Sequence, residues 1–323
     1  MKDQGESPLA ELKMDIPEGF YEPETRSGYF VSAQMKKIWA VELDLLSELL
    51  RVCRKHSIKI FASGGTLLGT VRHKGFIPWD DDIDMMMFRS DYDMLCEAAK
   101  DEFRYPYFFQ QEHTDPGCLY GYAKLRNSST TRIEGKFRDM DVNQGIFIDI
   151  FPLDNVSGNK LLWHKRVLNA KFWRFSAYLA ADFSTRAPSA PPEGKDLWAK
   201  AVYALNPLLS GFVTRHGLEE RAFTRFEKVC RRYNDRDTQI VSTLSFNFEK
   251  RLHWKWRSDF ENITWLPFEF LSMPVGTGYE HALETRYGNW KEFVVEGYHH
   301  DALALDTEKP YTETLRGLRE GKS

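Results

Sequence analysis

Two aspartates at the start of an apolar run are the residues of this sequence best suited to chemistry. Asp82 and Asp84 flank Ile83, and residues 83–88 read as a buried strand. Alternate side chains of a strand point to the same face, so both carboxylates are expected to point the same way. Carboxylates held together repel each other, and a divalent cation between them removes the repulsion. The pair therefore predicts a Mg²⁺ site completed by substrate phosphates, with Mn²⁺ as the other candidate metal.

A third carboxylate, Asp149, lies in a second apolar run at residues 146–151. An ionised aspartate among apolar neighbours is costly unless it is paired or bound to a metal. Asp149 is therefore a candidate third ligand, and the structural alternative is an aspartate satisfied by backbone donors at a strand end. For Asp82 and Asp84 the alternative is a solvated acidic turn, which the buried run after them disfavours. Asp154 is interpreted as a turn residue.

A glycine pair precedes these acids in the chain. Gly64, Gly65 and Thr66 follow a predicted strand at residues 58–62 and begin a short predicted helix. Free amide groups at a helix start favour anions, and glycines let a phosphate approach the backbone. The alternative is that the glycines serve only the geometry of the turn. Five basic residues are further candidates for phosphate contacts, with a solvated turn or an exposed strand as the alternative: Arg72, His73, Lys74, Lys124 and Arg126.

The sequence around these residues resembles the LicD family, which includes bacterial phosphocholine transferases and, more distantly, the fukutin-related proteins. The matching blocks are residues 64–69, 72–84 and 147–154, with weaker matches at 266–269 and 287–290. The resemblance implies a nucleotidyltransferase-like fold in which a glycine turn, an Asp-x-Asp pair and a third acid hold Mg²⁺ and a nucleotide. By this resemblance the catalytic and metal-binding residues are Asp82, Asp84 and Asp149, with Asp80 as a further candidate metal ligand.

The resemblance also implies a Mg²⁺-dependent phosphotransferase that uses a CDP-alcohol as donor. It would move a phosphoalcohol group, phosphocholine first among the candidates, to a hydroxyl of a cell-surface polysaccharide or lipopolysaccharide precursor and release CMP. Asp82 and Asp84 would hold the metal on the phosphates, and Asp149 would either complete the metal site or act as general base.

Three other functions remain open at this point. They are a nucleotidylyltransferase that attaches NMP and releases pyrophosphate, a metal-dependent glycosyltransferase, and a non-catalytic nucleotide-binding module. The glycine turn upstream of the acids argues against the glycosyltransferase.

The secondary structure expected around these residues predicts an α+β protein. Residues 31–155 are expected to form a nucleotidyltransferase-like catalytic core, a mixed sheet with flanking helices. Residues 156–300 are expected to be mostly helical and to complete the active-site cleft and the acceptor site. Residues 1–30 are interpreted as a loose N-terminal segment and residues 301–323 as a C-terminal tail.

Hydrophobic periodicity and turn residues predict the individual elements. A strand at residues 145–151 is expected to end at Pro152, and Ser90 with Asp93 predicts the N-cap of a helix. The predicted helices cover residues 31–56, 91–102, 161–181, 197–209, 218–233 and 279–287, and further strands cover 107–111, 121–126 and 240–248.

Composition excludes several classes of protein. The 323-residue chain is 42% hydrophobic and 28% charged, as in ordinary globular proteins. Its net charge is 44 − 47 = −3, so there is no global basic excess to hold duplex nucleic acid. No run of apolar residues is long enough to predict a spanning helix, and the start of the chain lacks a signal-peptide pattern. Four scattered cysteines are interpreted as reduced thiols, which favours a cytoplasmic location.

Two further stretches indicate partners besides the CDP-alcohol. Residues 160–175 carry five basic side chains, no acid and several aromatic residues. They are a candidate for peripheral contact with the inner face of a membrane, near a glycan or lipid-linked glycan acceptor, and the alternative is a helix with one packed and one solvated face. Aromatic residues between positions 254 and 268 are candidates to stack a choline-like cation, with core packing as the alternative.

Overall fold

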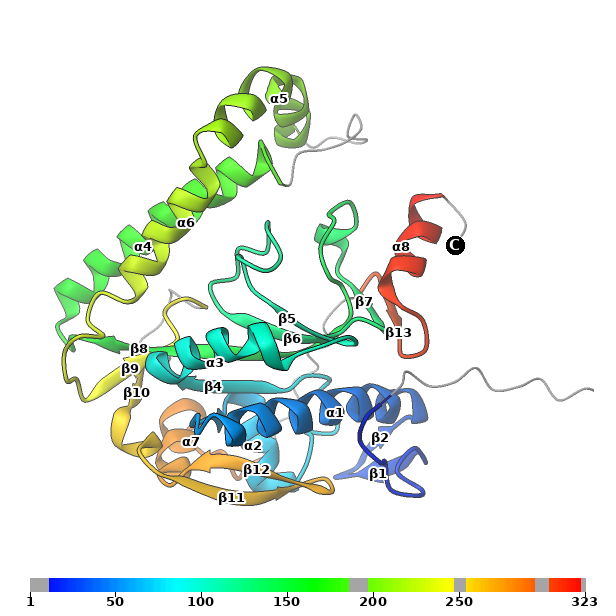
Figure 1. The fold of residues 1–323 in the computed structure, drawn as a ribbon. Coiled ribbons are helices and arrows are strands. Elements are labelled where there is room, and N and C mark those ends of the chain that lie inside the picture. Colours follow the sequence, from blue (N-terminus) through cyan, green and yellow to red (C-terminus); the bar gives the residue numbers. More distant parts are fainter. Residues whose placement is uncertain (1–11, 186–196, 247–253, 294–301, 321–323) are drawn as a thin grey trace, which may run out of the picture.

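The computed structural model describes residues 12–185, 197–246, 254–293 and 302–320 of the chain (Figure 1). Within these residues, seven strands form one mixed sheet in the order β10-β9-β8-β4-β3, with β6 beside β8 and β5 beside β6. This sheet, with its flanking helices, confirms the predicted α+β class. Its strands are β3 (Phe61–Ala62), β4 (Asp84–Phe88), β5 (Tyr107–Gln110), β6 (Ala123–Asn127), β8 (Ile146–Val156), β9 (Ile240–Ser242) and β10 (Trp254–Trp256).

β8 is the strand around which the sheet is built. One edge pairs in parallel with β4, and the other pairs with β6 over its first half and with β9 over its last three residues. The prediction that this strand ends at Pro152 is wrong. The Asp149 amide donates to the Ile83 carbonyl on the β4 side at 2.9 Å, so the alternation of a strand turns the Pro152 nitrogen to the opposite edge. There β6 has ended opposite Ile150 and β9 begins opposite Asp154, so no ladder hydrogen bond is lost.

Asp154 is a buried residue of β8 and does not lie in a turn, which corrects the prediction. It accepts two hydrogen bonds from the Arg89 guanidinium, at 2.9 and 2.7 Å. Arg89 is the first residue of α3 (Arg89–Glu102), so the helix begins one residue before Ser90. Phe88 occupies the N-cap position and gives no side-chain cap. The predicted cap at Ser90 is therefore wrong, and the buried ion pair joins this end of α3 to the sheet.

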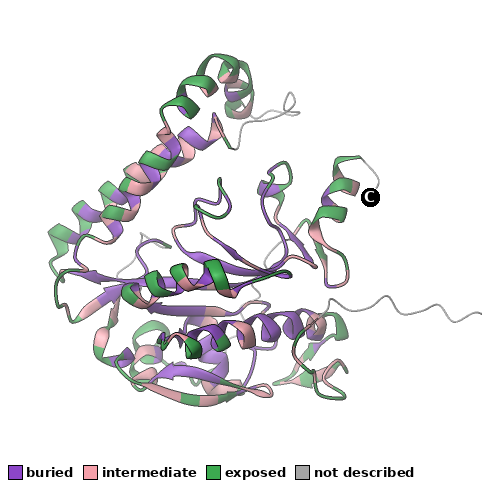
Figure 2. Ribbon diagram, in the orientation of Figure 1, coloured by how far each residue is buried: buried purple, intermediate pink, exposed green. Residues whose placement is uncertain are grey.

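Two helices, α1 (Ala33–Lys55) and α3, cover one face of the sheet (Figures 1 and 2). Their apolar stripes form one core with Met85 of β4 and with Ile148 and Ile150 of β8. Because side chains alternate along a strand, Asp84 and Asp149 point to the opposite face, away from α1 and α3. The helices thus bury one face of the central strands, and the acids belong to the other.

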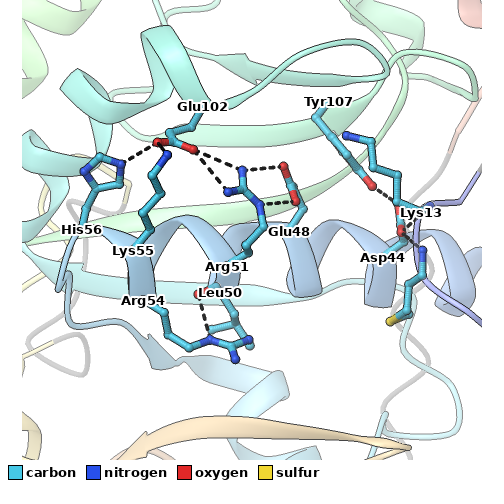
Figure 3. Close-up of polar contacts among 11 residues, drawn as sticks. Lys13, Asp44, Glu48, Leu50, Arg51, Arg54, Lys55, His56, Glu102 and Tyr107 are labelled. Carbon is cyan, nitrogen blue, oxygen red and sulfur yellow. Dashed lines mark hydrogen bonds and ion pairs between the residues drawn. The ribbon is translucent and has the colours of Figure 1, made fainter.

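Polar contacts fix α1 against its neighbours (Figure 3). Glu102, at the end of α3, lies 2.6 Å from the Lys55 Nζ and 2.8 Å from the His56 Nε2. These contacts, with a further one from Arg51, lower the pKa of Glu102 to about 2. In the middle of α1, Asp44 accepts a hydrogen bond from the Tyr107 hydroxyl of β5 at 2.7 Å. The helix is therefore held at two points as a rigid backing for the sheet.

Smaller elements complete the core. All but the last residue of the hairpin β1–β2 falls in residues 1–30, predicted as a loose segment, and Arg26 ties the hairpin to Glu269 at 2.5 Å. β13 pairs with β7, so part of the predicted C-terminal tail is joined to the core. Helix α7 has the predicted bounds. These elements are α2 (Gly64–His73), α7 (Tyr279–Tyr287), α8 (Tyr311–Arg319), β1 (Glu24–Arg26), β2 (Tyr29–Val31), β7 (Thr131–Ile133), β11 (Ile263–Phe268), β12 (Leu271–Gly276) and β13 (Ala304–Asp306).

Three helices form an arm that projects from the sheet (Figure 1). α4 (Lys160–Asp182) and α6 (Leu218–Cys230) pack along each other, and α5 (Leu197–Arg215) lies at the far end. Their presence confirms the predicted helical character of this region. Among the residues that the structure describes, no helix is both long and apolar enough to cross a membrane. All four cysteines are free thiols, as predicted.

Candidate active site

Three charged side chains form a row across the middle of the sheet. Asp84 of β4 lies directly beside Asp149 of β8 in the parallel register, and Asp149 lies directly opposite Lys124 of β6 in the antiparallel register. Residues in register share a face, so all three side chains point to the face away from α1 and α3. The predicted meeting of Asp84 and Asp149 on adjacent strands is therefore confirmed by the strand register.

Lys124 is the partner of Asp149. Its Nζ lies 2.5 Å from the Asp149 Oδ1 and 3.4 Å from the centre of the Phe147 ring, and the rings of Tyr120 and Tyr122 lie 5.0 and 5.4 Å away. Burial lowers the pKa of Lys124, while the Asp149 carboxylate opposes that shift. A buried ammonium in an aromatic cage thus compensates the charge of one of the two acids in the row.

The glycine turn lies directly against the acids. Gly64 has a φ of +53°, and a β-carbon added there would lie 3.0 Å from the Asp84 Oδ2. A β-carbon on Gly65 would lie 2.7 Å from the Asp80 Oδ2. The Asp84 amide donates to the Thr66 Oγ1 at 2.8 Å, which joins the first turn of α2 to the start of β4. The glycine turn therefore lies against two of the predicted acids, Asp80 and Asp84.

Asp84 is buried and lies near three other carboxylates. Burial and then the carboxylates of Asp82, Asp149 and Asp80 raise its pKa well above the usual range, and Arg286 opposes the shift. Uncompensated charge of this kind is what a cation would relieve.

The donor set fits Mg²⁺ held together with a substrate. Among the residues that the structure describes, no three His, Cys, Asp or Glu side chains are grouped as a complete metal site. Mg²⁺ commonly binds one or two carboxylates and takes its other ligands from phosphates and water. Asp84 together with Asp82 or with Asp149 supplies such a pair. The assignment of Asp80, Asp82, Asp84 and Asp149 as ligands stays a prediction.

Sequence reasoning missed three residues beside the glycine turn. A small pocket against Gly64 is lined by Lys255 of β10 and by Arg286 and Tyr287 of α7, together with Trp254 and other side chains. Burial and the nearby Arg286 lower the pKa of Lys255 to about 7, although Asp84 opposes the shift. A single Arg or Lys on a helix or short strand has no distinctive pattern, so only the fold brings these cations to the turn.

A second pocket lies on the other side of Arg286 and includes Asp80, Trp79 and Arg72. Arg72 donates to the backbone carbonyls of Trp290 and Glu292, at 3.2 and 3.1 Å. The guanidinium therefore helps to hold the segment after α7 against the end of α2. Arg72 lines a pocket next to the acids, where a substrate group could reach it.

The other predicted phosphate contacts lie elsewhere. His73 and Lys74 are at the far end of α2, and a helix of this length separates them from the glycine turn by about 15 Å. Burial, Arg72 and Arg26 lower the pKa of His73 to about 4. Buried Arg126 donates to the Gln110 side chain at 2.5 Å and to the Gly145 carbonyl at 2.7 Å. Of the basic residues predicted, only Arg72 and Lys124 lie near the acids.

The aromatic stretch of residues 254–268 divides between two roles. Phe260 and Phe268 are buried in the core, whereas Trp254 and Trp256 line the pocket against Gly64. Lys255 and Arg286 share that pocket, and their positive charge disfavours a quaternary ammonium group there. The pocket therefore suits an anionic group better than choline.

A mixed sheet with carboxylates on two adjacent strands, beside a glycine turn at a helix start, is the arrangement that the resemblance to nucleotidyltransferases predicts. Residues 57–186 match the model of the family described as LicD/FKTN/FKRP, nucleotidyltransferase domain. The resemblance to LicD is thereby confirmed over this stretch, which contains Gly64, Gly65, Asp84, Lys124 and Asp149.

Comparison with curated proteins gives the same result. The chain is 35% identical over 124 residues to the lipopolysaccharide cholinephosphotransferase LicD of Haemophilus influenzae, covering 35% of this chain and 42% of that protein. Uncharacterized proteins of Rickettsia prowazekii and Rickettsia typhi are each 43% identical over 47 residues, or 15% of this chain. The chain thus matches less than half the length of each of these relatives, 42%, 18% and 15% respectively.

Proposed function

We propose that this protein is a Mg²⁺-dependent phosphotransferase that moves a phosphoalcohol group from a CDP-alcohol to a glycan hydroxyl and releases CMP. CDP-choline is the first candidate donor, because the Haemophilus relative is a lipopolysaccharide cholinephosphotransferase. A cell-surface polysaccharide or lipopolysaccharide precursor is the candidate acceptor. The observation that carries the proposal is the closeness of Asp84 to the Gly64 turn, which brings an acidic site and an anion site together.

The positive groups around the turn support a diphosphate donor. The first amides of α2 lie at the positive end of a helix dipole, and Arg286 and Lys255 line the adjoining pocket. A planar guanidinium and an ammonium beside free amides make charge-assisted hydrogen bonds to phosphate oxygens. These groups would fix the donor with its diphosphate against the acids.

The acids would act on the phosphate that is transferred. Mg²⁺, when bound, supplies a positive charge that neutralises the diphosphate and the departing CMP. Asp84, with Asp82 or Asp149, would hold the ion next to the glycine turn. The acceptor oxygen attacks the phosphorus that carries the alcohol, the bond from that phosphorus to CMP breaks, and CMP leaves with the electron pair. Such in-line transfer is governed mainly by positioning and charge.

Asp149 has two candidate roles, metal ligand or acceptor of the proton from the attacking hydroxyl. Asp149→Asn separates them. If Asp149 is a ligand, the variant loses the rise in melting temperature that Mg²⁺ causes. If it is the general base, the variant keeps that rise and loses turnover. Lys124 would in either case hold the carboxylate in place through the ion pair at 2.5 Å.

The test is release of CMP by the purified full chain in Mg²⁺. CDP-choline, CDP-ethanolamine, CDP-glycerol and CDP-ribitol are offered with lipopolysaccharide stripped of phosphocholine. CMP release that requires Mg²⁺, falls at least a hundredfold in Asp84→Asn and is unchanged in Asp101→Asn supports the proposal. Asp101 is the matched control because it is an exposed aspartate of α3 on the other side of the sheet.

The same assay distinguishes the other functions. Pyrophosphate release from CTP would indicate a nucleotidylyltransferase, and hydrolysis of UDP- or GDP-sugars would indicate a glycosyltransferase. Tight nucleotide binding without turnover would indicate a binding module. Any of these results, in the absence of CMP release, would replace the proposal.

The proposal includes a place for the reaction. A lipid-linked acceptor requires the protein to work at the inner face of a membrane, and residues 160–175 were predicted to make that contact. These residues lie within α4 of the projecting arm.

A further inference from the structure

The arm carries a second apolar face that the fold leaves uncovered. One face of α4 packs on α6, through Trp163, Ala170 and Ala177. The opposite face presents another apolar row, which recurs at steps of seven, four and three residues and so lies on one side of the helix. The row consists of Leu161, Leu168, Phe172 and Phe175, each more than half exposed, with exposed fractions of 64, 68, 59 and 67%.

Helix α5 repeats the pattern at the far end of the arm (Figures 1 and 2). Only its Val202 and Val213 are buried. Leu197, Leu205, Leu208 and Phe212 are spaced to share one side of the helix, and Leu208 is 75% exposed. A soluble helix normally places polar residues on its outer side. Two neighbouring helices that both reverse this rule mark an interaction surface.

The charge along these rows is predominantly positive. α5 contains no acid, and α4 contains none before Asp182, its last residue. Lys165 flanks the apolar row of α4 on one side, and Lys160 and Lys171 flank it on the other, since they lie within about 80° of it on a helical projection. All three lysines are exposed. Long lysine side chains beside an apolar row can reach outward to anionic groups while their stems cover apolar surface.

A groove between the three helices continues this surface. Its volume is about 850 Å³, and its walls include Leu179 of α4, Leu209 and Phe212 of α5. Three basic residues and one acid of α6 also line it, namely Arg221, Arg225, Lys228 and Glu220. Apolar walls with basic groups match the two chemical parts of an anionic amphiphile.

We propose that the outer faces of α4 and α5 form a docking surface for an anionic lipid bilayer. The apolar rows would enter the boundary between headgroups and acyl chains, and the lysines would meet the anionic headgroups. The excess of positive charge along the rows favours this partner over a second copy of the chain, because two such surfaces brought face to face would place lysines against lysines.

The contact differs from the one predicted for residues 160–175 alone. Two of the five basic side chains counted there are turned inward. Arg166 donates to the Asn155 carbonyl at 2.6 Å, and Arg174 donates to the Ser245 carbonyl at 2.9 Å. The surface therefore depends on the apolar rows and on α5, which the basic run did not indicate.

The experiment is co-sedimentation of the full chain with vesicles, without substrate. Vesicles of phosphatidylcholine are compared with vesicles that also contain phosphatidylglycerol, at low and high salt. One variant carries Leu168→Gln, Phe172→Gln and Phe175→Gln, and another carries Leu205→Gln, Leu208→Gln and Phe212→Gln. The matched control carries Phe30→Gln, Met94→Gln and Leu303→Gln, which replace exposed apolar side chains elsewhere on the molecule.

The wild type and the control are expected to bind the anionic vesicles, and added salt is expected to weaken that binding. Each arm variant should lower the partition coefficient on the order of a hundredfold, because three apolar side chains no longer leave water. Circular dichroism of each variant checks that the fold is kept. CMP release with a water-soluble donor and acceptor should not change, so this result is separable from that of the enzymatic test.

Other outcomes would overturn the docking surface. They are absence of wild-type binding to anionic vesicles, equal binding by the arm variants and the wild type, or equal binding to neutral and anionic vesicles. Self-association of the wild type that the arm variants abolish, without vesicle binding, would assign the surface to contact between copies of the chain.

Discussion

Lys124→Met tests whether the Lys124 ammonium stands in for part of the cationic charge that the acids require. Lys124 is 3% exposed, and its Nζ lies 2.5 Å from the Asp149 Oδ1. Methionine keeps most of the side-chain length and suits the aromatic cage, so loss of packing contributes little. The substitution therefore removes one positive charge and leaves Asp149 beside Asp84 with no ammonium.

The expected loss follows from the burial of the pair. Removing one partner of a buried ion pair costs about 3–5 kcal/mol. The Asp149 side chain keeps 14% exposure, so water relieves part of that loss and the lower value, about 3 kcal/mol, applies. For 323 residues the unfolding entropy is about 0.7 kcal/mol per kelvin, so the melting temperature should fall by about 4 °C.

Thermal unfolding followed by circular dichroism measures this change, first in EDTA and then in excess Mg²⁺. Mg²⁺ should raise the melting temperature of Lys124→Met more than that of the wild type, because two uncompensated carboxylates bind the ion more tightly. Lys136→Met is the matched control, since Lys136 makes an exposed ion pair with Glu134 and such pairs contribute little. The reasoning is refuted if Lys124→Met is as stable as the wild type in EDTA and responds no more strongly to Mg²⁺.

Three further results are expected. Gly65→Ala should change the melting temperature by less than about 2 °C, because the new β-carbon meets only the end of the flexible Asp80 side chain. The same substitution should lower CMP release at least tenfold. Gly135→Ala is the control and should change neither quantity, because the space around Gly135 is open. Wild-type affinity for CDP-choline, measured by calorimetry, should fall about tenfold as the pH rises from 6 to 8, because Lys255 loses its proton near pH 7. Lys255→Arg stays charged over this range and should keep the affinity. Arg89→Met should lower the free energy of unfolding in urea by about 3 kcal/mol, because it leaves the buried Asp154 carboxylate without its ion-pair partner and with the Asn234 side chain as a neutral donor, and an unchanged midpoint would contradict that account.

Local patterns were sufficient for most helices and for the acidic strands. α7 ends where predicted because Gly288 stops the helical pattern locally, and the apolar stripe of α1 covers nearly the predicted residues. The short strands β1, β7 and β13 were missed, since three residues carry too little periodicity to predict a strand. The strand end predicted at Pro152 was wrong because a proline removes a ladder hydrogen bond only where its nitrogen faces a paired strand, and the sequence does not show which edge that nitrogen faces.

From the sequence alone came the chemistry of the site: carboxylates spaced for one face of a strand, a glycine turn before a helix, and a LicD-type signature around them. Those features depend on neighbours in the chain, so periodicity and residue type are enough to predict them. Tertiary structure decided which cations accompany them. Lys124, Lys255 and Arg286 come from three distant elements. Burial lowers the pKa of Lys124 and of Lys255, and packing brings Arg286 close to Asp84, and no local pattern encodes either effect.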